Sequence, residues 1–450
     1  MAPTAPVPLS FTASPTNLTL TPSQTFHLTI FQDLHFGEAE DTTWGPLQDI
    51  DTLSVIETVL NSENETQLVV LNGDLITGED TFRENATAYV DEIVAPLVRR
   101  GLSWAATYGN HDSDYNLSRT AIYNREKTYS NSLTGNMVQT NDSGVSNYYL
   151  PVYTDGTNTD ANAVPALLLW FFDSRGGYVF HSSPRSCCIY SASECETSCA
   201  KGLSFSFHEK SSNLAKTLLA SNYYQQLTTD GTPIGQPNWV SSDVVNWFNS
   251  TRTTLAALYS PSPLPPSLAF VHIPIDAFLS IQESSSGIDA HTEPGINADI
   301  PLSQQGVQSD EGSSQTSFTY EGQDVPFMQA LLGTENLLAV FSGHDHGNDW
   351  CARWDGKVSG LELELVGDGI DLCFSRHTGY GGYGSWTRGS RQVKVSLAGE
   401  GGVAVETWMR LEDGSVTGRV TLNATFGTDE YPEVPLTYTS EYDEGDPYTK

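Results

Sequence analysis

Five short motifs of carboxylate, amide and imidazole side chains stand out in this 450-residue chain. They offer ligands of the kind that iron, zinc or manganese takes in proteins, and not those that calcium or copper(I) prefers. The motifs are Asp33-Leu34-His35, Gly73-Asp74, Gly109-Asn110-His111-Asp112, His272 and Gly343-His344-Asp345-His346. Two metal ions about 3.5–4 Å apart can activate water and stabilise the transition state of phosphoryl transfer. The motifs together therefore predict a binuclear metal site and a metal-dependent phosphoester hydrolase.

The expected division of ligands between the two ions follows from their chemistry. A binuclear site needs a bridging carboxylate, and Asp74 is the candidate because Gly73 would let its turn come close to the ions. Asp33 and His35 can hold one ion, and Asn110 offers a neutral amide oxygen to the other. The remaining imidazoles would complete the coordination of both ions, and they belong to His272, His344 and His346.

Nearly all of these motifs follow a short apolar run that predicts a buried strand. Alternating strands and helices are typical of an α/β fold, in which ligands bind at the carboxyl ends of the strands. The predicted strands cover residues 26–31, 68–71, 104–108, 167–172, 268–271, 337–341, 361–366, 393–397 and 403–409. Apolar side chains at helical spacing predict helices over residues 51–61, 84–99 and 238–249.

The composition along the chain predicts one domain over residues 26–425. A Pro/Ser/Thr-rich arm at 1–25 precedes it, and an acidic tail at 426–450 follows it. Two polar insertions are expected within the domain, at about residues 179–236 and 280–325. The first is rich in Ser, Cys and Gly and is expected to be cross-linked by disulfides. The second is expected to form a long loop over the site.

The charge of the chain restricts its partners. Lys and Arg number 21 against 55 Asp and Glu, so the formal net charge is −34. Such a surface repels duplex nucleic acid and acidic membranes, and the lack of a long apolar run predicts no membrane span. A small phosphoester substrate is the expected partner, attracted by the bound metal ions. The sequence does not indicate the oligomeric state.

Two features predict a secreted protein. Sites for N-glycosylation recur along the chain, at Asn17, Asn64, Asn85, Asn116, Asn141, Asn249 and Asn423. An even number of cysteines suggests disulfides formed in an oxidising compartment, and these are Cys187, Cys188, Cys195, Cys199, Cys351 and Cys373. Their connectivity stays open, with a bridge between the last two as one candidate. The first residues lack the basic region and apolar core of a signal peptide, so we expect the signal peptide to be absent from this chain.

The ordered motifs resemble those of the calcineurin-like metallophosphoesterase superfamily, D-x-H, G-D, G-N-H-[DE], H and G-H-x-H, over roughly residues 26–410. A branch related to purple acid phosphatases, with fungal and plant members, is similar at 31–37, 344–351 and 379–384. The resemblance implies a four-layer α/β/β/α sandwich of mixed sheets. It also implies one ion on Asp33, His35, Asp74 and His346, and the other on Asp74, Asn110, His272 and His344.

The resemblance further implies a catalytic role for His111, which would lie beside the substrate and be oriented by Asp112. His111 would protonate the leaving oxygen or bind a phosphoryl oxygen while a metal-bound hydroxide attacks in line. One departure from purple acid phosphatases concerns colour. Thr77 stands where they have a ligand tyrosine, and His35 stands where they have glycine. The iron–tyrosinate chromophore is therefore expected to be missing.

Further substrate contacts are predicted for His377, Arg376 and His291, which lie in polar segments near the expected cleft. An arginine can hold a phosphate through two hydrogen bonds, although pairing with a surface carboxylate is the alternative. The leading function is an acid-phosphatase-like phosphomonoesterase. A phosphodiesterase acting on nucleotide, glycerol or sugar phosphodiesters remains an alternative, as does a non-catalytic binding protein on the same scaffold.

Overall fold

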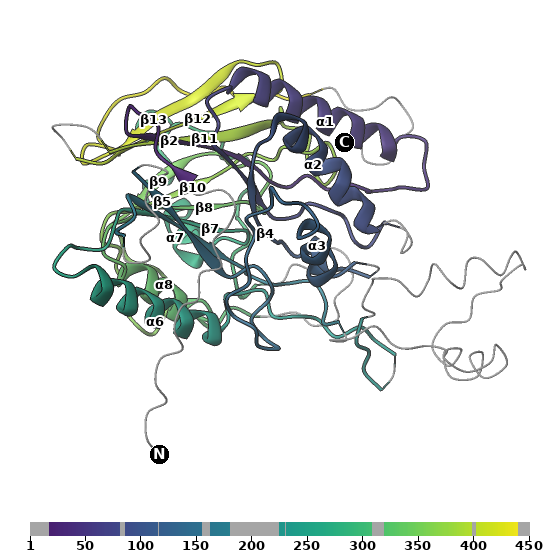
Figure 1. Ribbon diagram of the computed structural model, residues 1–450, viewed down its shortest axis with the longest axis horizontal. Coiled ribbons are helices and arrows are strands. Elements are labelled where there is room, and N and C mark those ends of the chain that lie inside the picture. Colours follow the sequence, from purple (N-terminus) through teal and green to yellow (C-terminus); the bar gives the residue numbers. More distant parts are fainter. Residues whose placement is uncertain are drawn as a thin grey trace, which may run out of the picture.

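The computed structural model describes residues 18–81, 86–115, 117–154, 163–180, 225–229, 231–307, 319–397 and 402–439. Its framework is a pair of mixed β-sheets (Figure 1), with strand orders β1-β5-β6-β7-β8-β10-β9 and β13-β12-β11-β2-β3-β4. The first sheet contains β1 (Leu18–Thr19), β5 (Tyr148–Tyr153), β6 (Leu167–Phe172), β7 (Ser267–Val271), β8 (Leu337–Ser342), β9 (Cys351–Trp354) and β10 (Ile370–Phe374). The second contains β2 (Thr25–Phe31), β3 (Leu68–Asn72), β4 (Trp104–Thr107), β11 (Gly389–Ser396), β12 (Ala404–Leu411) and β13 (Val416–Leu422).

Helices cover the outer face of each sheet (Figure 1). Apolar side chains of one set pack against β2, β3 and β4, and this set comprises α1 (Gly45–Ser62), α2 (Tyr89–Arg100) and α3 (Arg119–Glu126). Another set packs against β6, β7, β8 and β10, and comprises α6 (Ser242–Tyr259), α7 (Asp276–Gln282) and α8 (Val325–Leu332). The layers follow the order α/β/β/α, so the predicted fold class is confirmed.

A third apolar core lies between the two sheets and holds them together. Aromatic rings stack across neighbouring strands within it, with centroids 4.6 Å apart for Tyr148 and Phe171 and 5.0 Å apart for Phe171 and Phe270. Burying each such ring contributes about 1.5–3 kcal/mol. Because this core fixes the position of one sheet relative to the other, the loops at the strand ends of both sheets lie in defined positions.

Some predicted elements differ from the structure. Helix α6 covers Ser242–Tyr259 instead of 238–249, because the Ser241 side chain caps its start and Leu255 extends its buried face beyond the polar run. The predicted arm at 1–25 includes β1, which pairs in parallel with β5, and the first residue of β2. Strands β5, β9, β10 and β13 and helices α3, α7 and α8 were not among the predictions.

The strand predicted at 361–366 is wrong. Its alternating Leu and Glu are typical of a half-buried strand. However, Leu363 is 49% exposed, Leu365 alone among these residues is buried, and their pairing is a single bridge between Lys357 and Val366. Among the described residues, no strand pairs with this segment, so its alternation does not form a strand.

The two predicted insertions are described to different extents. The first is described only at its ends, where bridges join Tyr178 to Gly235 and Phe180 to Gln225. Within the second, the Ala298 N–H donates to the Gly347 carbonyl at 2.9 Å. This part of the second insertion therefore lies directly on the loop that follows β8.

The disulfide between Cys351 and Cys373 joins directly opposed residues of β9 and β10. The glycosylation candidates Asn64, Asn141 and Asn423 are exposed, whereas Asn249 is half-buried. The remaining candidates lie outside the described residues, and they are Asn17, Asn85, Asn116, Cys187, Cys188, Cys195 and Cys199.

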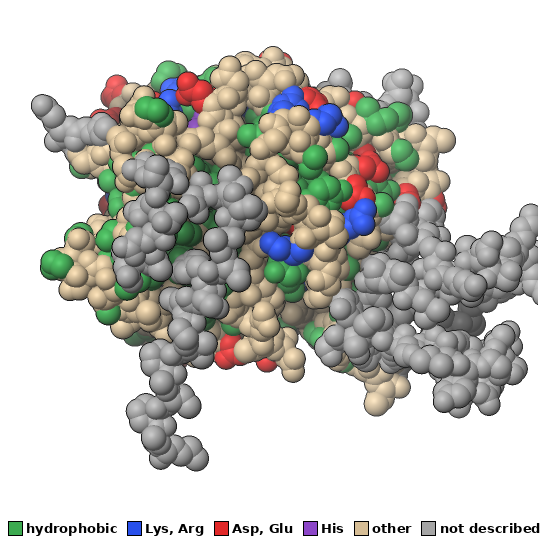
Figure 2. Space-filling model, in the orientation of Figure 1, with side chains coloured by type: hydrophobic (Ala, Val, Ile, Leu, Met, Phe, Trp, Pro, Cys, Tyr) green, Lys and Arg blue, Asp and Glu red, His purple; other side chains and the backbone are tan. Residues whose placement is uncertain are grey.

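Surface features bear on the predicted partners. On the face seen in Figure 2, Lys and Arg side chains occur as small separate groups, several of them beside Asp or Glu. Among the described residues, no helix has both the length and the apolar character that crossing a bilayer requires.

Candidate metal centre

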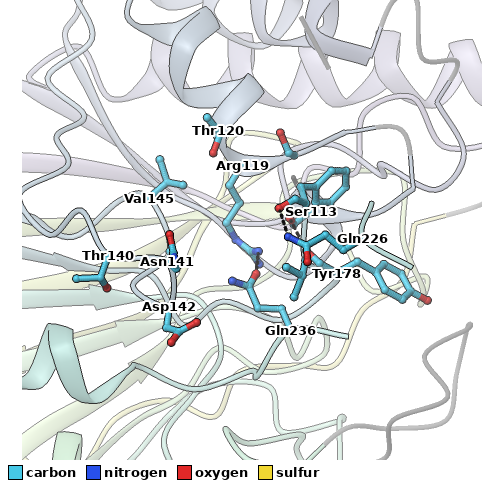
Figure 3. Close-up of a pocket in the computed structure, with 14 residues that line it drawn as sticks. Ser113, Arg119, Thr120, Thr140, Asn141, Asp142, Val145, Tyr178, Gln226 and Gln236 are labelled. Carbon is cyan, nitrogen blue, oxygen red and sulfur yellow. Dashed lines mark hydrogen bonds between the residues drawn. The ribbon is translucent and has the colours of Figure 1, made fainter. Parts of the chain in front are cut away.

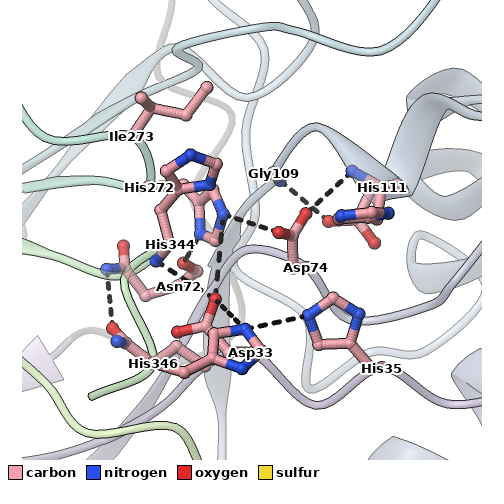
Figure 4. A network of polar contacts seen from close by, with 12 residues as sticks. Asp33, His35, Asn72, Asp74, Gly109, His111, His272, Ile273, His344 and His346 are labelled. Atoms are coloured by element: carbon pink, nitrogen blue, oxygen red, sulfur yellow. Dashed lines mark hydrogen bonds and ion pairs between the residues drawn. The ribbon is translucent and has the colours of Figure 1, made fainter. Parts of the chain in front are cut away.

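The carboxyl ends of strands from both sheets bring the predicted ligands together (Figure 4). Each ligand lies in the first residues after its strand, as expected for an α/β fold. Asp33 and His35 follow β2, Asp74 follows β3, Asn110 follows β4, His272 follows β7, and His344 and His346 follow β8.

The backbone at several of these residues is strained. Asp33, His35, Asp74 and His344 have φ angles of 49°, 49°, 47° and 76°, in the left-handed region that non-glycine residues rarely occupy. Such conformations cost about 1–3 kcal/mol each and cluster at functional sites. The surrounding loops therefore hold these side chains in orientations that local preference would not select.

One group of candidate ligands, here called site A, comprises Asp33, His35 and His346, whose ligand atoms lie within 4.8 Å of one another. The two imidazoles face each other, with Nε2 atoms 3.2 Å apart. Nδ1 of His346 donates to the Tyr383 carbonyl at 2.8 Å, so its Nε2 keeps a lone pair for the site. Nδ1 of His35 lies 3.0 Å from the Thr77 hydroxyl, which can fix its ring in the same way.

The second group, site B, comprises Asp74, His272 and His344, again within 4.8 Å. Nδ1 of His272 donates to the Asn72 carbonyl at 2.8 Å, and its Nε2 lies 2.9 Å from Asp74 Oδ2. Gly73 permits this packing, because its φ is +91° and a Cβ there would lie 2.4 Å from His272 Nδ1. The glycine thus lets the turn approach an imidazole ligand.

Unpartnered atoms test whether these residues suit metal ions. Within the described residues, Asp33 Oδ2 and Asn110 Oδ1 are buried and have no hydrogen-bond partner. Leaving such an atom unsatisfied costs about 1–3 kcal/mol. In addition, a neutral His272 would turn its Nε2 lone pair towards the Asp74 carboxylate, so a cation or a proton must separate them. These oxygen and nitrogen atoms fit two cations of the iron, zinc or manganese type.

The pKa shifts describe the charges in the site. Burial lowers the pKa of His344 and of His346 to about 3, so both imidazoles are neutral, which is the form that binds metal. Burial raises the pKa of Asp33 to about 7. Burial would also raise the pKa of Asp74, but the charge of His272 and other histidines outweighs it and lowers that pKa well below its usual value.

His111 lies beside site A, with its ring centroid 5.0 Å from that of His35. Its Nδ1 is 2.7 Å from Glu79 Oε1 and 3.5 Å from Asp114 Oδ2. Burial would lower the pKa of His111, but the carboxylates of Glu79 and Asp74 outweigh burial and raise it well above its usual value. The arrangement therefore places a proton donor next to the candidate ligands.

Asp112 does not orient His111, which corrects the sequence prediction. Its carboxylate accepts hydrogen bonds from the backbone N–H groups of Leu75, Ile76 and Gly109, at 2.9, 3.1 and 2.8 Å. Consecutive residues of this short helical turn point in different directions, so Asp112 is fully buried while His111 is partly exposed. Asp112 thus ties the loop after β3 to the loop after β4.

The glycine-rich segment 379–384 packs directly on site A. Gly382 has a φ of +77°, and a Cβ there would lie 2.3 Å from His346 Cε1 and 2.8 Å from His35 Cδ2. The Tyr383 ring stacks on His346 with centroids 4.1 Å apart and planes inclined by 13°. The absence of a side chain at Gly382 therefore lets both imidazoles keep their positions.

The substrate contacts predicted for Arg376 and His377 are wrong. Both side chains are fully buried, and Arg376 is paired with Asp349 at 2.8 Å. Nε2 of His377 lies 2.9 Å from the Trp386 carbonyl. Both residues follow β10 at the same sheet edge as the ligands, but their side chains are buried, with Arg376 against Asp349 and His377 against the Trp386 carbonyl. His291 is exposed and belongs to neither site, and its predicted contact stays a prediction.

A polar pocket of about 460 Å³ lies beside the loop after β4 (Figure 3). Its wall includes Ser113 and Arg119, but none of the candidate ligands. Nη2 of Arg119 donates to the Gly109 carbonyl at 2.6 Å, and Nη1 donates to Gln236 Oε1 at 2.8 Å. Arg119 therefore anchors the loop that carries Asn110 from the side of this pocket.

Sequence reasoning missed three contributors to the site: Glu79, the orienting contact of Thr77, and Tyr383. A carboxylate so soon after the expected bridging Asp74 could have been weighed as a partner of His111. The other two contacts join segments more than 35 residues apart, 42 for His35 with Thr77 and 37 for His346 with Tyr383. No local pattern marks contacts of that kind.

Comparisons with known proteins show what the chain is similar to. The family model for calcineurin-like phosphoesterases matches residues 26–348. The chain is 25% identical over 427 residues to "Probable inactive purple acid phosphatase 29" of Arabidopsis thaliana, covering 90% of this chain and 87% of that protein. It is 24% identical over 409 residues to "Probable inactive purple acid phosphatase 14" of the same plant, covering 86% and 81%. A solved dimetal phosphatase from Danio rerio aligns with a TM-score of 0.43 and 12% identity, covering 88% of this chain and 98% of that one.

Proposed function

Because this chain belongs to the calcineurin-like phosphoesterase family, we propose that it is a phosphomonoesterase that uses two bound metal ions. Site A with Asp74 would hold one ion, and site B with Asn110 would hold the other, so that Asp74 is shared. The observation that carries this proposal is the pair of buried, unpartnered oxygens, Asp33 Oδ2 and Asn110 Oδ1. When bound, the two ions would supply an activated water and positive charge at the phosphoryl oxygens.

His111 is the proposed general acid. Its Nε2 gives a proton to the leaving oxygen as the phosphorus–oxygen ester bond breaks and the electron pair of that bond stays on the oxygen. The water oxygen forms the new bond to phosphorus, and a proton from that water later restores the imidazolium. A positioned acid of this kind contributes on the order of 10²–10⁴-fold to the rate.

The test combines metal analysis with a substrate panel. Protein purified without chelator should contain close to two equivalents of iron, zinc or manganese, and should release phosphate from alkyl and nitrophenyl monoesters. Faster turnover of diesters than of monoesters would replace the proposal with a phosphodiesterase. One equivalent or none, with activity that chelators do not affect, would contradict the binuclear site.

A second candidate is a non-catalytic protein on the same scaffold. The two Arabidopsis relatives carry "Probable inactive" in their names, and this observation favours that reading. The intact set of candidate ligands and the adjacent His111 favour an enzyme instead. A protein that binds both metal ions but releases phosphate from no ester in the panel would decide for the non-catalytic function.

Secretion is part of the proposal. Its support is the exposure of the acceptor residues Asn64, Asn141 and Asn423 and the disulfide between Cys351 and Cys373. Mass spectrometry after treatment with a glycosidase should find converted asparagines at these acceptor sites in protein from a eukaryotic secretory host. Unmodified peptides throughout would contradict the predicted compartment.

A further inference from the structure

We infer that Glu79 is the residue that positions His111 for proton transfer, in the role that the sequence suggested for Asp112. The inference deepens the proposed phosphoesterase function and rests on it. The observation behind it is the 2.7 Å contact between Glu79 Oε1 and His111 Nδ1, which no motif in the sequence marks.

The backbone around Glu79 is fastened to the segment that carries His111. The Gly78 N–H donates to the His111 carbonyl at 3.1 Å, and the Asp80 N–H donates to the Thr77 carbonyl at 3.2 Å. A Cβ at Gly78 would lie 2.9 Å from the His111 carbonyl oxygen, so only a glycine permits this approach. These contacts hold the backbone of Glu79 close to His111, and the Glu79 carboxylate reaches His111 Nδ1 from this turn.

This contact decides which nitrogen of His111 serves the reaction. A carboxylate can only accept, so Nδ1 of His111 carries the proton of this hydrogen bond. Within the described residues, Nε2 makes no hydrogen bond, and the ring makes a T-shaped contact with the ring of His35 in site A. The His111 and Glu79 side chains are 33% and 27% exposed, so the pair lies at the border between site A and solvent. Nε2 is thereby left as the nitrogen that can meet a leaving oxygen.

The other nearby carboxylates cannot take this role equally well. Asp112 is occupied by three backbone N–H groups, and Asp114 Oδ2 lies 3.5 Å from His111 Nδ1. Asp80, the next residue in the turn, accepts a hydrogen bond from the Ala39 N–H at 3.2 Å. Asp80 therefore provides a matched control, because it is an acid of the same turn with a different partner.

The first test is spectroscopic and needs no turnover. Long-range proton–nitrogen spectra of His111, assigned by loss of its signals in His111→Asn, should show a hydrogen-bonded Nδ1 proton in the wild type and in Asp80→Ala. The signal should persist in Glu79→Gln, whose amide oxygen still accepts, and should disappear in Glu79→Ala. Persistence in Glu79→Ala would overturn the inference.

The second test is kinetic. In Glu79→Ala, kcat for an alkyl monoester should fall roughly 10- to 100-fold, a part of what a positioned acid contributes, with KM nearly unchanged. Hydrolysis of a nitrophenyl ester should fall much less, because its leaving group needs no proton, and Glu79→Gln should recover part of the loss. Equal losses for both esters, or no loss, would overturn the positioning role.

Metal analysis tests the alternative that Glu79 and its neighbours bind a metal ion. Glu79, His111 and Asp114 lie close enough together to share a cation. Wild-type protein should nevertheless hold two equivalents, and Glu79→Ala should retain both. A third equivalent that Glu79→Ala loses would make the cluster a metal site and refute the inference. If the wild type hydrolyses no ester, the proposed function fails, and the spectroscopic test still decides whether Glu79 positions His111.

Discussion

Replacing Thr77 with valine should selectively weaken metal binding at site A. The Thr77 hydroxyl lies 3.0 Å from His35 Nδ1, and both residues are 4% exposed. Valine has nearly the same shape but no hydroxyl, so the variant leaves the Nδ1–H group of His35 buried without a partner. The ring then loses the contact that keeps Nε2 directed at the ion.

The size of the effect follows from the lost hydrogen bond. An unsatisfied buried donor costs about 1–3 kcal/mol. At about 1.4 kcal/mol per tenfold change, this corresponds to a site A affinity roughly 5- to 140-fold weaker. The range overlaps the roughly 10- to 100-fold loss typical when a partner that orients a metal-binding histidine is removed.

The assay is competition for zinc between chelator-stripped protein and a fluorescent chelator, which yields one dissociation constant per ion. Thr77→Ser keeps the hydroxyl and should bind as the wild type does. Thr334→Val is a matched control. It also removes a buried hydroxyl, which donates to the Ala330 carbonyl of α8 at 2.8 Å, but neither residue belongs to site A or site B. Unchanged affinity in a folded Thr77→Val protein, or equal weakening by the serine variant, would refute the reasoning.

The remaining predictions concern ligands, packing, colour and pH. Asp74→Ala should lose both metal ions and activity together, whereas His111→Ala should keep the metals and lose activity mainly on esters with poor leaving groups; elemental analysis beside the two assays checks both. Gly382→Ala should displace both site A imidazoles and lower the metal content towards one equivalent, which metal analysis after dialysis measures. No tyrosinate-to-iron band should appear in the visible spectrum, because a threonine replaces the ligand tyrosine of purple acid phosphatases; a purple preparation would contradict the ligand assignment. Burial raises the pKa of Asp49, which accepts from the Gly37 N–H, from 3.8 to about 7. The folded state then binds the extra proton, so stability should fall as pH rises from about 4 to about 7. Urea unfolding at pH 4 and at pH 7 measures this fall in the free energy of unfolding. The fall should be smaller in Asp49→Asn than in the wild type, by up to about 4 kcal/mol.

Short windows of sequence were sufficient for the framework and for the types of ligand. Apolar runs such as 68–71 and 268–271 predicted strands that the structure contains, because a strand buried on both faces needs continuous apolar residues. Their alternation with helices predicted an α/β fold, whereas the four-layer sandwich was implied by the resemblance to the family. The motifs at the ends of these strands also contain the residues of sites A and B, because ligands of an α/β fold follow the carboxyl ends of its strands. Each site takes residues from both sheets, so the packing of the sheets brings them together.

Partners within the site were decided only by the tertiary structure. Sequence adjacency suggested that Asp112 orients His111, but a helical turn directs neighbouring side chains apart, and Glu79 reaches the imidazole from another loop. Arg376 and His377 lie at the correct sheet edge but are buried against internal partners.

The physical reason is the range over which each kind of information acts. Periodicity and ligand chemistry are properties of a few consecutive residues, so the sequence alone predicted strands such as β2, β3, β7 and β8 and the donor set that follows them. Which nitrogen faces an ion depends on contacts such as His346 with Tyr383 and His35 with Thr77, made between separate loops. Those contacts exist only after two sheets have packed against each other, and that packing sums over many side chains.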